Sequence, residues 1–390
     1  MSSPPGRSRP IKSSSFSAMR RVYLDYNAST PLDPRVAETM RAAIEDGYGN
    51  PSSPHWAATP AKQFVETGRG QIAALLGCTP REVVFTSGGS EANNLALKGA
   101  FFAAGDRPVH IITTEIEHPS ILAPCAFLER QGARITRLPV DRTGLVDPDD
   151  LRRAIGPDTL LVTIMHANNE VGTIEPIEAC AQIAREHRVL LHTDAAQSVG
   201  KIATRVEALG VDLLSIAGHK LYAPKGIGAL YVRAGTPLEP LIHGAGHEHG
   251  RRAGTESALL AAALGSACAI AGELCFVPEL QRLRNLFWDR LQGLFGDRVV
   301  LNGHPKLRLP NTLNVSFVGH VGAAILQAMP EVAASTGSAC HSGQIRLSPV
   351  LAAMGVAPEV GMGAIRFSLG RNTTLKDIDA VVEHLAQVLA

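Results

Sequence analysis

The chain has 390 residues, of which 45% are hydrophobic, and its formal net charge is +1. A chain of this length buries a large core and is long enough for two domains. Because the charges are balanced and interspersed, the sequence argues against a nucleic-acid or membrane surface. We therefore expect an enzyme that acts on a small molecule, with no direct contact to nucleic acid and none to a membrane.

The first 21 residues are rich in Ser, Pro and Arg, contain no acidic residue and lack the apolar segment of a secretory signal. We expect residues 1–21 to form a disordered tail. An organelle transit peptide has a similar composition and is the alternative, although no amphipathic helix is visible in this stretch.

The cysteines are scattered over the chain, with no CxxC pair among Cys78, Cys125, Cys180, Cys268, Cys275 and Cys340. This distribution is unlike the disulfide framework of a small secreted protein. It favours a reducing compartment, and we expect a cytoplasmic protein.

From Arg81 to Val232, short β-branched runs alternate with longer helical patterns. This alternation predicts βαβ units and a largely parallel sheet. The apolar runs, in chain order, are VVF, HIITT, LLVTIM, VLLHT, LLSIA and GALYV.

Polar residues occur where the first five of these runs end. In chain order they are Gly89 and Ser90, His118, Asn169, Asp194, and His219 with Lys220. Ligands of an open parallel sheet bind at the carboxyl ends of its strands, so five separate segments point to one site. Loops are polar in general, but the chemical diversity of this set favours a particular ligand.

Beyond Glu256 the pattern changes to a long helix, a strand-like stretch TLNVSFVG, a loop and a final helix from Leu375. This order predicts a second, α+β domain. The stretch 258–272 is the most apolar of the chain but is interrupted by small residues, so we expect a buried helix and no membrane span.

Three of the predicted loops carry complementary chemistry. The TSGGSEANN turn offers backbone N–H groups and a helix N-terminus to a phosphate, although capping by Ser90 explains it equally well. Asp194 ends a very apolar strand, where a carboxylate needs a cation. Burial lowers the pKa of a lysine, which frees the amine of Lys220 for a Schiff base, although a structural loop lysine is the alternative.

Together, a phosphate loop, an Asp for a pyridinium nitrogen and a Lys for an aldehyde match pyridoxal 5′-phosphate. His118 is placed to stack on the ring, and Asn169 and Gln197 to hydrogen-bond its phenolic oxygen. A nicotinamide site is disfavoured because no GxGxxG opens the first βα unit.

The residues also carry a family resemblance that runs in register from Val22 to the C-terminus. The stretches that carry it are YLDYNASTPLDP, GNPSSPH, FTSGGSEANNLAL, TEIEHPSI, MHANNEVGTIEPI, HTDAAQSVGK, GHKLYAPKGIGALYVR, RRAGTES, STGSACHSG and IRFSLGR. They resemble the class-V, fold-type I pyridoxal-phosphate enzymes of the cysteine desulfurase and selenocysteine lyase family.

The resemblance implies an α/β fold: a mainly parallel seven-stranded sheet flanked by helices, with a smaller α+β domain. It places residues 35–255 in the large cofactor domain and residues 22–34 and 256–390 in the small domain. It also implies a homodimer with its active sites at the subunit interface.

Carried over by motif, the resemblance assigns roles to individual residues. Lys220 would form the Schiff base, Asp194 would pair with the pyridinium nitrogen, His118 would stack, and Asn169 and Gln197 would contact the phenolic oxygen and substrate. The phosphate would be held by Gly89, Ser90 and His219, with Thr255 from the neighbouring subunit. Arg366 would bind the substrate carboxylate. One departure is Ala217, where the desulfurases have a Ser, so a hydroxyl contact to the phosphate is missing.

Cys340 lies among small residues in AASTGSACHSGQ, which indicates a loop that carries one thiol. The resemblance implies that Cys340 takes the sulfur of L-cysteine as a persulfide, that L-alanine is the second product, and that an acceptor such as an iron–sulfur scaffold receives the sulfur. His341 is either an aid to the thiol or a solvated loop residue.

Three alternatives remain open. A selenocysteine lyase shares the scaffold, and Ala217 and the His341 that follows the cysteine resemble that branch. An inactive sulfur carrier or scaffold is disfavoured because Lys220, Asp194, His118 and Cys340 are all present. A zinc site at His243, His247 and His249 lacks an acidic or thiolate partner, so we expect no metal.

Overall fold

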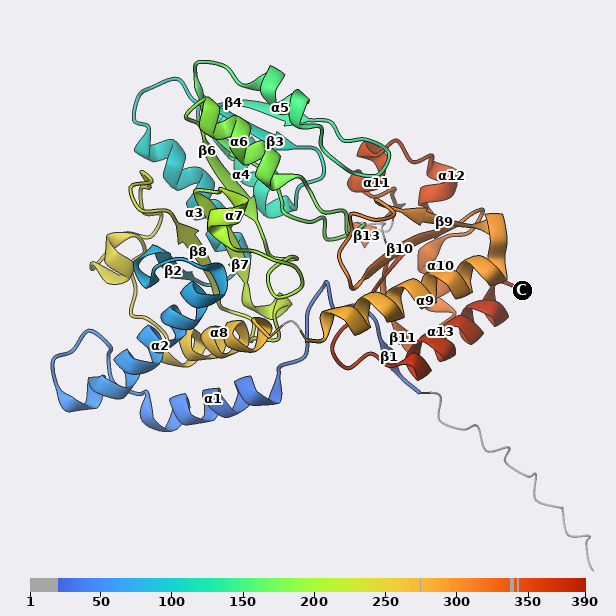
Figure 1. The fold of residues 1–390 in the computed structure, drawn as a ribbon, viewed down its shortest axis with the longest axis horizontal. Helices are drawn as coiled ribbons and strands as arrows, with labels where there is room; N and C mark the ends of the chain where they lie inside the picture. Colours follow the sequence, from blue (N-terminus) through green and yellow to red (C-terminus); the bar gives the residue numbers. More distant parts are fainter. Residues whose placement is uncertain (1–19, 274, 337–339, 342–343) are drawn as a thin grey trace, which may run out of the picture.

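The computed structural model describes residues 20–273, 275–336, 340–341 and 344–390. The predicted tail therefore lies almost entirely outside the described residues. A larger unit around one sheet and a smaller unit around a second sheet lie side by side, and the last helix belongs to the smaller unit (Figure 1).

The large sheet has seven strands in the order β2-β8-β7-β6-β5-β3-β4. Their bounds are β2 Val83–Thr86, β3 His110–Thr114, β4 Arg134–Leu138, β5 Thr159–Thr163, β6 Leu190–Asp194, β7 Leu213–Ala217 and β8 Gly228–Val232. The pairings from β7 through β6, β5 and β3 to β4 are parallel, whereas β8 runs antiparallel to β2 and β7. This confirms the predicted mainly parallel seven-stranded sheet.

Both faces of this sheet are covered, because successive strand residues point to opposite sides. Val84 packs with helices α3 (Gly89–Ala103) and α4 (Pro119–Arg130). Val83 and Phe85 pack in the core on the opposite face. The helices of that face include α2 Thr59–Leu76, α5 Pro148–Ala154, α6 Ile177–Glu186 and α7 Val206–Leu209. Burial on both faces explains why these strands are continuous apolar runs.

The apolar stretch near residue 260 forms the buried helix α8 (Ala258–Ala271), as predicted. It packs against α1 (Pro34–Asp46) and α2 of the large unit. A Cβ on Gly265 would lie 2.3 Å from the Cα of Gly68, so α8 and α2 cross closely only because both positions are glycine. The predicted domain boundary at residue 256 would therefore separate α8 from the core of the large unit. The packing of α8 against α1 and α2 favours a boundary after this helix.

The small unit contains an antiparallel sheet in the order β12-β15-β10-β9. Its strands are β9 Val299–Asn302, β10 Thr312–Phe317, β12 Ser335–Thr336 and β15 Ala364–Ser368. Helices α9 (Val277–Phe295) and α13 (Leu375–Val388) pack on it, and Val22 and Leu24 from the start of the described chain join the same core. Both ends of the described chain thus contribute to this unit.

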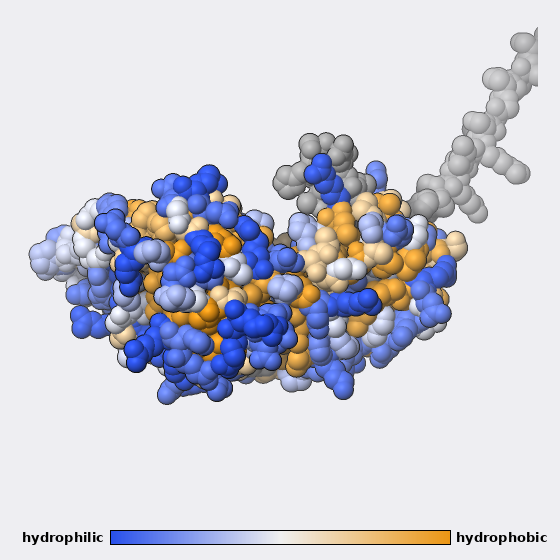
Figure 2. All heavy atoms as spheres, turned by 90° about the horizontal axis from the view of Figure 1, so that it is seen from above, coloured by the Kyte–Doolittle hydropathy of each residue, from blue (hydrophilic) through white to orange (hydrophobic). Residues whose placement is uncertain are grey.

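Shorter elements complete the small unit: β1 Val22–Tyr23, β11 Val332–Ala333, β13 Cys340–His341, β14 Gln344–Ile345, α10 Gly322–Gln327, α11 Pro349–Ala353 and α12 Pro358–Gly361. β1 pairs with β11. Hydrophilic and hydrophobic residues are interspersed over both units on the face shown in Figure 2. None of the helices in the described part of the chain combines the length and hydrophobicity that a membrane span requires.

Candidate active site

A cavity of about 620 Å³ lies where the strands of the large sheet end, with β15 of the small sheet contributing to its wall. Nine of the side chains or backbone positions singled out from the sequence line it: Gly89, Ser90, His118, Asn169, Asp194, Gln197, His219, Lys220 and Arg366. The structure therefore brings together residues from six separate segments of the chain. Their individual roles stay predictions.

Lys220 ends the short helix η3 (Gly218–Lys220), which directly follows strand β7. Its Nζ donates to the backbone carbonyls of Asn27, at 2.7 Å, and Ala28, at 2.8 Å. Burial, followed by the positive charge of Arg366, lowers the pKa of Lys220 to about 8. The amine is thus far more often neutral near pH 7 than an exposed lysine, and a neutral amine is the nucleophile for an aldehyde.

Asp194 is the last residue of β6, and only 7% of its surface is exposed. Its Oδ2 accepts a hydrogen bond from Nδ2 of Asn93 at 2.7 Å, and its Oδ1 accepts from the backbone N–H of Ala196 at 2.9 Å. These two donors fix the carboxylate at the cavity wall while leaving it able to accept a further hydrogen bond.

His118 caps the N-terminus of α4, where its Nδ1 accepts from the N–H of Ser120 at 3.1 Å. Nδ1 also lies 2.7 Å from Oγ of Ser120, which accepts from Asn93 at 2.8 Å. Asn93 and Ser120 therefore connect the imidazole to Asp194, a link that motif reasoning did not identify. Withdrawal from water lowers the pKa of His118, with a smaller opposing effect of Asp194, so the ring is mainly neutral near pH 7.

Helix α3 begins at Gly89, so its unpaired N–H groups face the cavity beside Ser90. A Cβ on Gly89 would lie 3.1 Å from the Cβ of Ala217, which shows how closely strand β7 approaches this turn. His219 adds an imidazole whose pKa burial lowers to about 4. Its Nδ1 lies 3.4 Å from Oγ of Ser29. A neutral imidazole here is suited to hydrogen bonding with an anion.

Arg366 reaches the cavity from strand β15 and is 8% exposed. One terminal nitrogen donates to Oδ1 of Asp25 at 2.7 Å and to Oγ of Ser335 at 2.9 Å. The other donates to the backbone carbonyl of Asn169 at 3.0 Å, while the buried Nε has no hydrogen-bond partner among the residues that the structure describes. Asp25 and Ser335 were not foreseen as partners, because they lie 341 and 31 residues away.

Two predicted site residues do not join this group in the chain as described. Thr255 is exposed and does not line the cavity of its own chain. Cys340 belongs to β13, which pairs antiparallel with β14. Its backbone is thus in a short strand, whereas the sequence predicted a loop, and the structure does not describe the Cys340 and His341 side chains.

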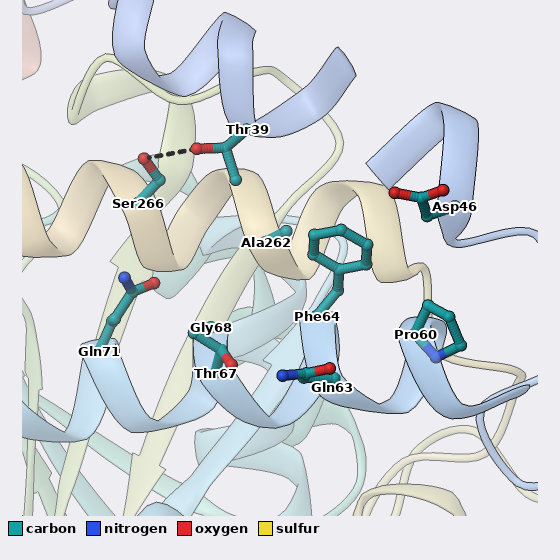
Figure 3. A pocket seen from close by; sticks show the side chains of 10 residues that line it. All are labelled: Thr39, Asp46, Pro60, Gln63, Phe64, Thr67, Gly68, Gln71, Ala262 and Ser266. Atoms are coloured by element: carbon teal, nitrogen blue, oxygen red, sulfur yellow. Dashed lines mark hydrogen bonds between the residues drawn. The ribbon is translucent and has the colours of Figure 1, made fainter. Parts of the chain in front are cut away.

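A second cavity of about 410 Å³ lies between α1, α2 and α8 (Figure 3). Asp46 is the one charged residue of its lining, which otherwise consists of small, amide and apolar side chains such as Gln63 and Phe64. Oγ1 of Thr39 donates to Oγ of Ser266 at 3.2 Å across it. The described residues contain no cluster of three or more His, Cys, Asp or Glu side chains that could hold a metal ion.

The cavity at the sheet edge fits pyridoxal phosphate. It combines a helix N-terminus for an anion, a buried carboxylate for a cationic nitrogen and a lysine of lowered pKa for an aldehyde. The buried Oδ1 of Asn93, next to the carboxylate, has no hydrogen-bond partner in the described structure. These groups match the phosphate, the ring nitrogen and the aldehyde of that cofactor.

Comparisons with known proteins agree with this assignment. The model of the aminotransferase class-V family matches residues 22–381. The cysteine desulfurase IscS of Dictyoglomus turgidum is 46% identical over 375 residues, which cover 95% of each chain. The IscS of Methanosarcina thermophila is 43% identical over 374 residues, covering 95% of this chain and 92% of the relative.

Solved structures of related proteins have the same fold over most of the chain. A NifS-like protein superposes with a TM-score of 0.89 at 37% identity, covering 95% of this chain and 99% of the other. SspA in complex with cysteine superposes with a TM-score of 0.79 at 38% identity, covering 90% and 99%.

Proposed function

The chain belongs to the class-V aminotransferase family, whose cysteine desulfurase members depend on pyridoxal phosphate, and on that premise we propose that it is a cysteine desulfurase. It converts L-cysteine to L-alanine and transfers the sulfur to Cys340 as a persulfide. The observation that carries this proposal is the cavity in which Lys220, of lowered pKa, lies with Asp194 and Arg366.

The cofactor would be held by groups at one edge of the large sheet. Gly89, Ser90 and His219 would bind its phosphate, Asp194 would bind its ring nitrogen and Lys220 would bind its aldehyde. His118 would stack on the ring, while Asn169 and Gln197 would hydrogen-bond the phenolic oxygen. When bound, pyridoxal phosphate withdraws electrons from the substrate and so acidifies the proton on Cα.

Arg366 binds the substrate carboxylate and, together with Asn169, orients the Cα–H bond toward Lys220. The neutral amine of Lys220 then takes the Cα proton at Nζ, and the carbonyls of Asn27 and Ala28 accept hydrogen bonds from the resulting ammonium.

The thiolate of Cys340 attacks the substrate sulfur. A new S–S bond forms, the Cβ–S bond breaks, and its electron pair stays with the carbon fragment. That fragment takes up one proton at Cβ, recovers one at Cα from the ammonium of Lys220 and leaves as alanine, while Cys340 keeps the extra sulfur. An acceptor protein such as an iron–sulfur scaffold then removes the sulfur from the persulfide.

We place the enzyme in the cytoplasm as a homodimer, in which Thr255 completes the phosphate site of the partner subunit. The exposure of Thr255, outside the cavity of its own chain, supports this arrangement.

Parallel assays with L-cysteine and L-selenocysteine test the function. The purified chain is expected to contain bound pyridoxal phosphate, which gives a visible absorbance band, and to release alanine from L-cysteine. Turnover of L-selenocysteine alone would contradict the proposal and favour the lyase that Ala217 and His341 suggest. A chain that binds no pyridoxal phosphate would exclude both activities.

A further inference from the structure

Lys201 is a buried lysine for which the reaction above has no use. It follows β6 in a tight turn, and 7% of its surface is exposed. Its two hydrogen-bond acceptors are both amide oxygens, and no ion pair joins it to a carboxylate within the residues that the structure describes. Burying an amine without a counter-ion is costly, and a Met or Leu would fill the same space at lower cost.

A chain of hydrogen bonds connects the amine of Lys201 to the amine of Lys220. Its Nζ donates to Oε1 of Gln197 at 3.0 Å. The amide nitrogen of Gln197 donates to the backbone carbonyl of Asn27, also at 3.0 Å. That same carbonyl accepts from Nζ of Lys220 at 2.7 Å. The two amines are therefore linked through one glutamine side chain and one carbonyl oxygen.

Asn27, the shared residue, is 1% exposed and held on several sides. Its side chain accepts from Asn311 at 3.0 Å and from Lys201 at 3.5 Å, and donates to Oγ1 of Thr312 at 2.8 Å. Its backbone N–H donates to Oγ of Ser368 at 2.9 Å. The carbonyl that holds Lys220 thus belongs to a residue that is fixed by strands β10 and β15 of the small sheet and by the turn after β6.

The turn that carries Lys201 also contacts the neighbour of Lys220. Gly200 has a φ of 73°, and a Cβ there would lie 2.4 Å from Cδ1 of Leu221. Glycine favours the left-handed conformation here, and its lack of a side chain lets Leu221 lie close to this turn. The backbone next to Lys201 therefore packs against the side chain next to Lys220.

We propose that Lys201 is a positioning residue, which acts through Gln197 and Asn27 to hold the amine of Lys220 in the orientation that pyridoxal phosphate requires. The inference rests on the proposed function, since it assigns Lys220 to the cofactor aldehyde. Burial, followed by the charges of Lys220 and Arg366, lowers the pKa of Lys201 to about 7. Both its charged and its neutral forms carry N–H groups, so it donates to the two amide oxygens in either form.

The test uses the full-length chain, from which the cofactor has been removed, and measures the rate of pyridoxal phosphate uptake from its visible absorbance. Lys201→Met keeps the hydrocarbon stem but removes the donor. Uptake is expected to slow about tenfold, the effect of one lost orienting hydrogen bond. Lys376→Met, which removes an exposed lysine of α13, is the matched control and is expected to leave the rate unchanged.

Urea unfolding separates positioning from support of the fold. Because Lys201→Met removes a buried amine without a counter-ion, the variant is expected to be at least as stable as the wild type. Slower uptake that is matched by a comparable loss of stability would overturn the inference in favour of a structural role. Wild-type uptake in Lys201→Met would overturn it as well.

A double variant tests whether Lys201 acts through Gln197. If it does, Gln197→Leu with Lys201→Met takes up the cofactor no more slowly than Gln197→Leu alone. If the factors by which the two substitutions slow cofactor uptake multiply in the double variant, Lys201 acts independently of Gln197. That result would overturn the inference. A wild type that takes up no cofactor would instead refute the proposed function.

Discussion

The two walls of the cavity are built differently. On the large-sheet wall, Asp194 and His118 are connected by hydrogen bonds through Asn93 and Ser120, all from segments of one unit. On the small-sheet wall, Arg366 is held by partners from the N-terminal segment and from a loop of the large unit. Asp194 and His118, which are assigned to the cofactor ring, are therefore fixed within one unit, whereas the position of Arg366, which is assigned to the substrate, depends on how the two units meet.

Lys220→Ala should have the largest effect. It removes both the amine that binds the aldehyde and the base for the Cα proton, so alanine release is expected to fall on the order of 10⁴-fold. Pyridoxal phosphate should still bind without a covalent link through the other groups of the large-sheet wall. Absorbance of the bound cofactor together with an alanine assay would check both statements, and near-normal turnover would refute the role of Lys220.

Asp194→Asn should have the next largest effect. An amide does not supply the negative charge that keeps the ring nitrogen protonated, so kcat is expected to drop roughly 10³-fold. Asp46→Asn, in the second cavity, is the matched control and should retain full activity. Equal losses in both variants would show that the two cavities are not functionally distinct.

Arg366→Lys probes the opposite wall. A lysine does not reproduce the planar fork that binds a carboxylate through two hydrogen bonds, so the KM for L-cysteine is expected to rise about tenfold to thirtyfold. The absorbance of the cofactor should not change. A changed cofactor spectrum would show that the two walls do not act separately.

The smallest expected effect concerns the pH dependence of the rate at which the chain takes up pyridoxal phosphate. Burial and Arg366 lower the pKa of Lys220 to about 8, while Asp25 and Asp194 oppose this shift. The uptake of pyridoxal phosphate needs the neutral amine, so its rate should rise with pH around a midpoint of about 8 and level off at higher pH. Stopped-flow absorbance across this range would measure the midpoint, and a midpoint near 10.5 would show that Lys220 is not desolvated.

Much of the large unit could be predicted because its strands are buried on both faces. All six predicted apolar runs form strands, and the helix from Leu375 begins where it was expected. The strand missed by pattern, β4, lies at the sheet edge and contains Arg134, Thr136 and Arg137. An edge strand with polar residues lacks the apolar run on which the prediction depended.

The partners that hold the site could not be read from local patterns. Asn27 contacts Lys201, Lys220 and Asn311 over separations of 174, 193 and 284 residues. Only the tertiary fold brings them together. One local signal was available: Lys201 lies between Val199-Gly200 and Ile202, and a lysine among such neighbours is unusual.

The mass of the Cys340 peptide after a single turnover of L-cysteine tests the central claim most directly. We expect this peptide to gain one sulfur atom while one equivalent of alanine is released, and we expect Cys340→Ala to bind the cofactor normally but release almost no alanine. Alanine release with an unmodified Cys340 peptide, or undiminished release by Cys340→Ala, would contradict the assignment of Cys340 as the sulfur acceptor.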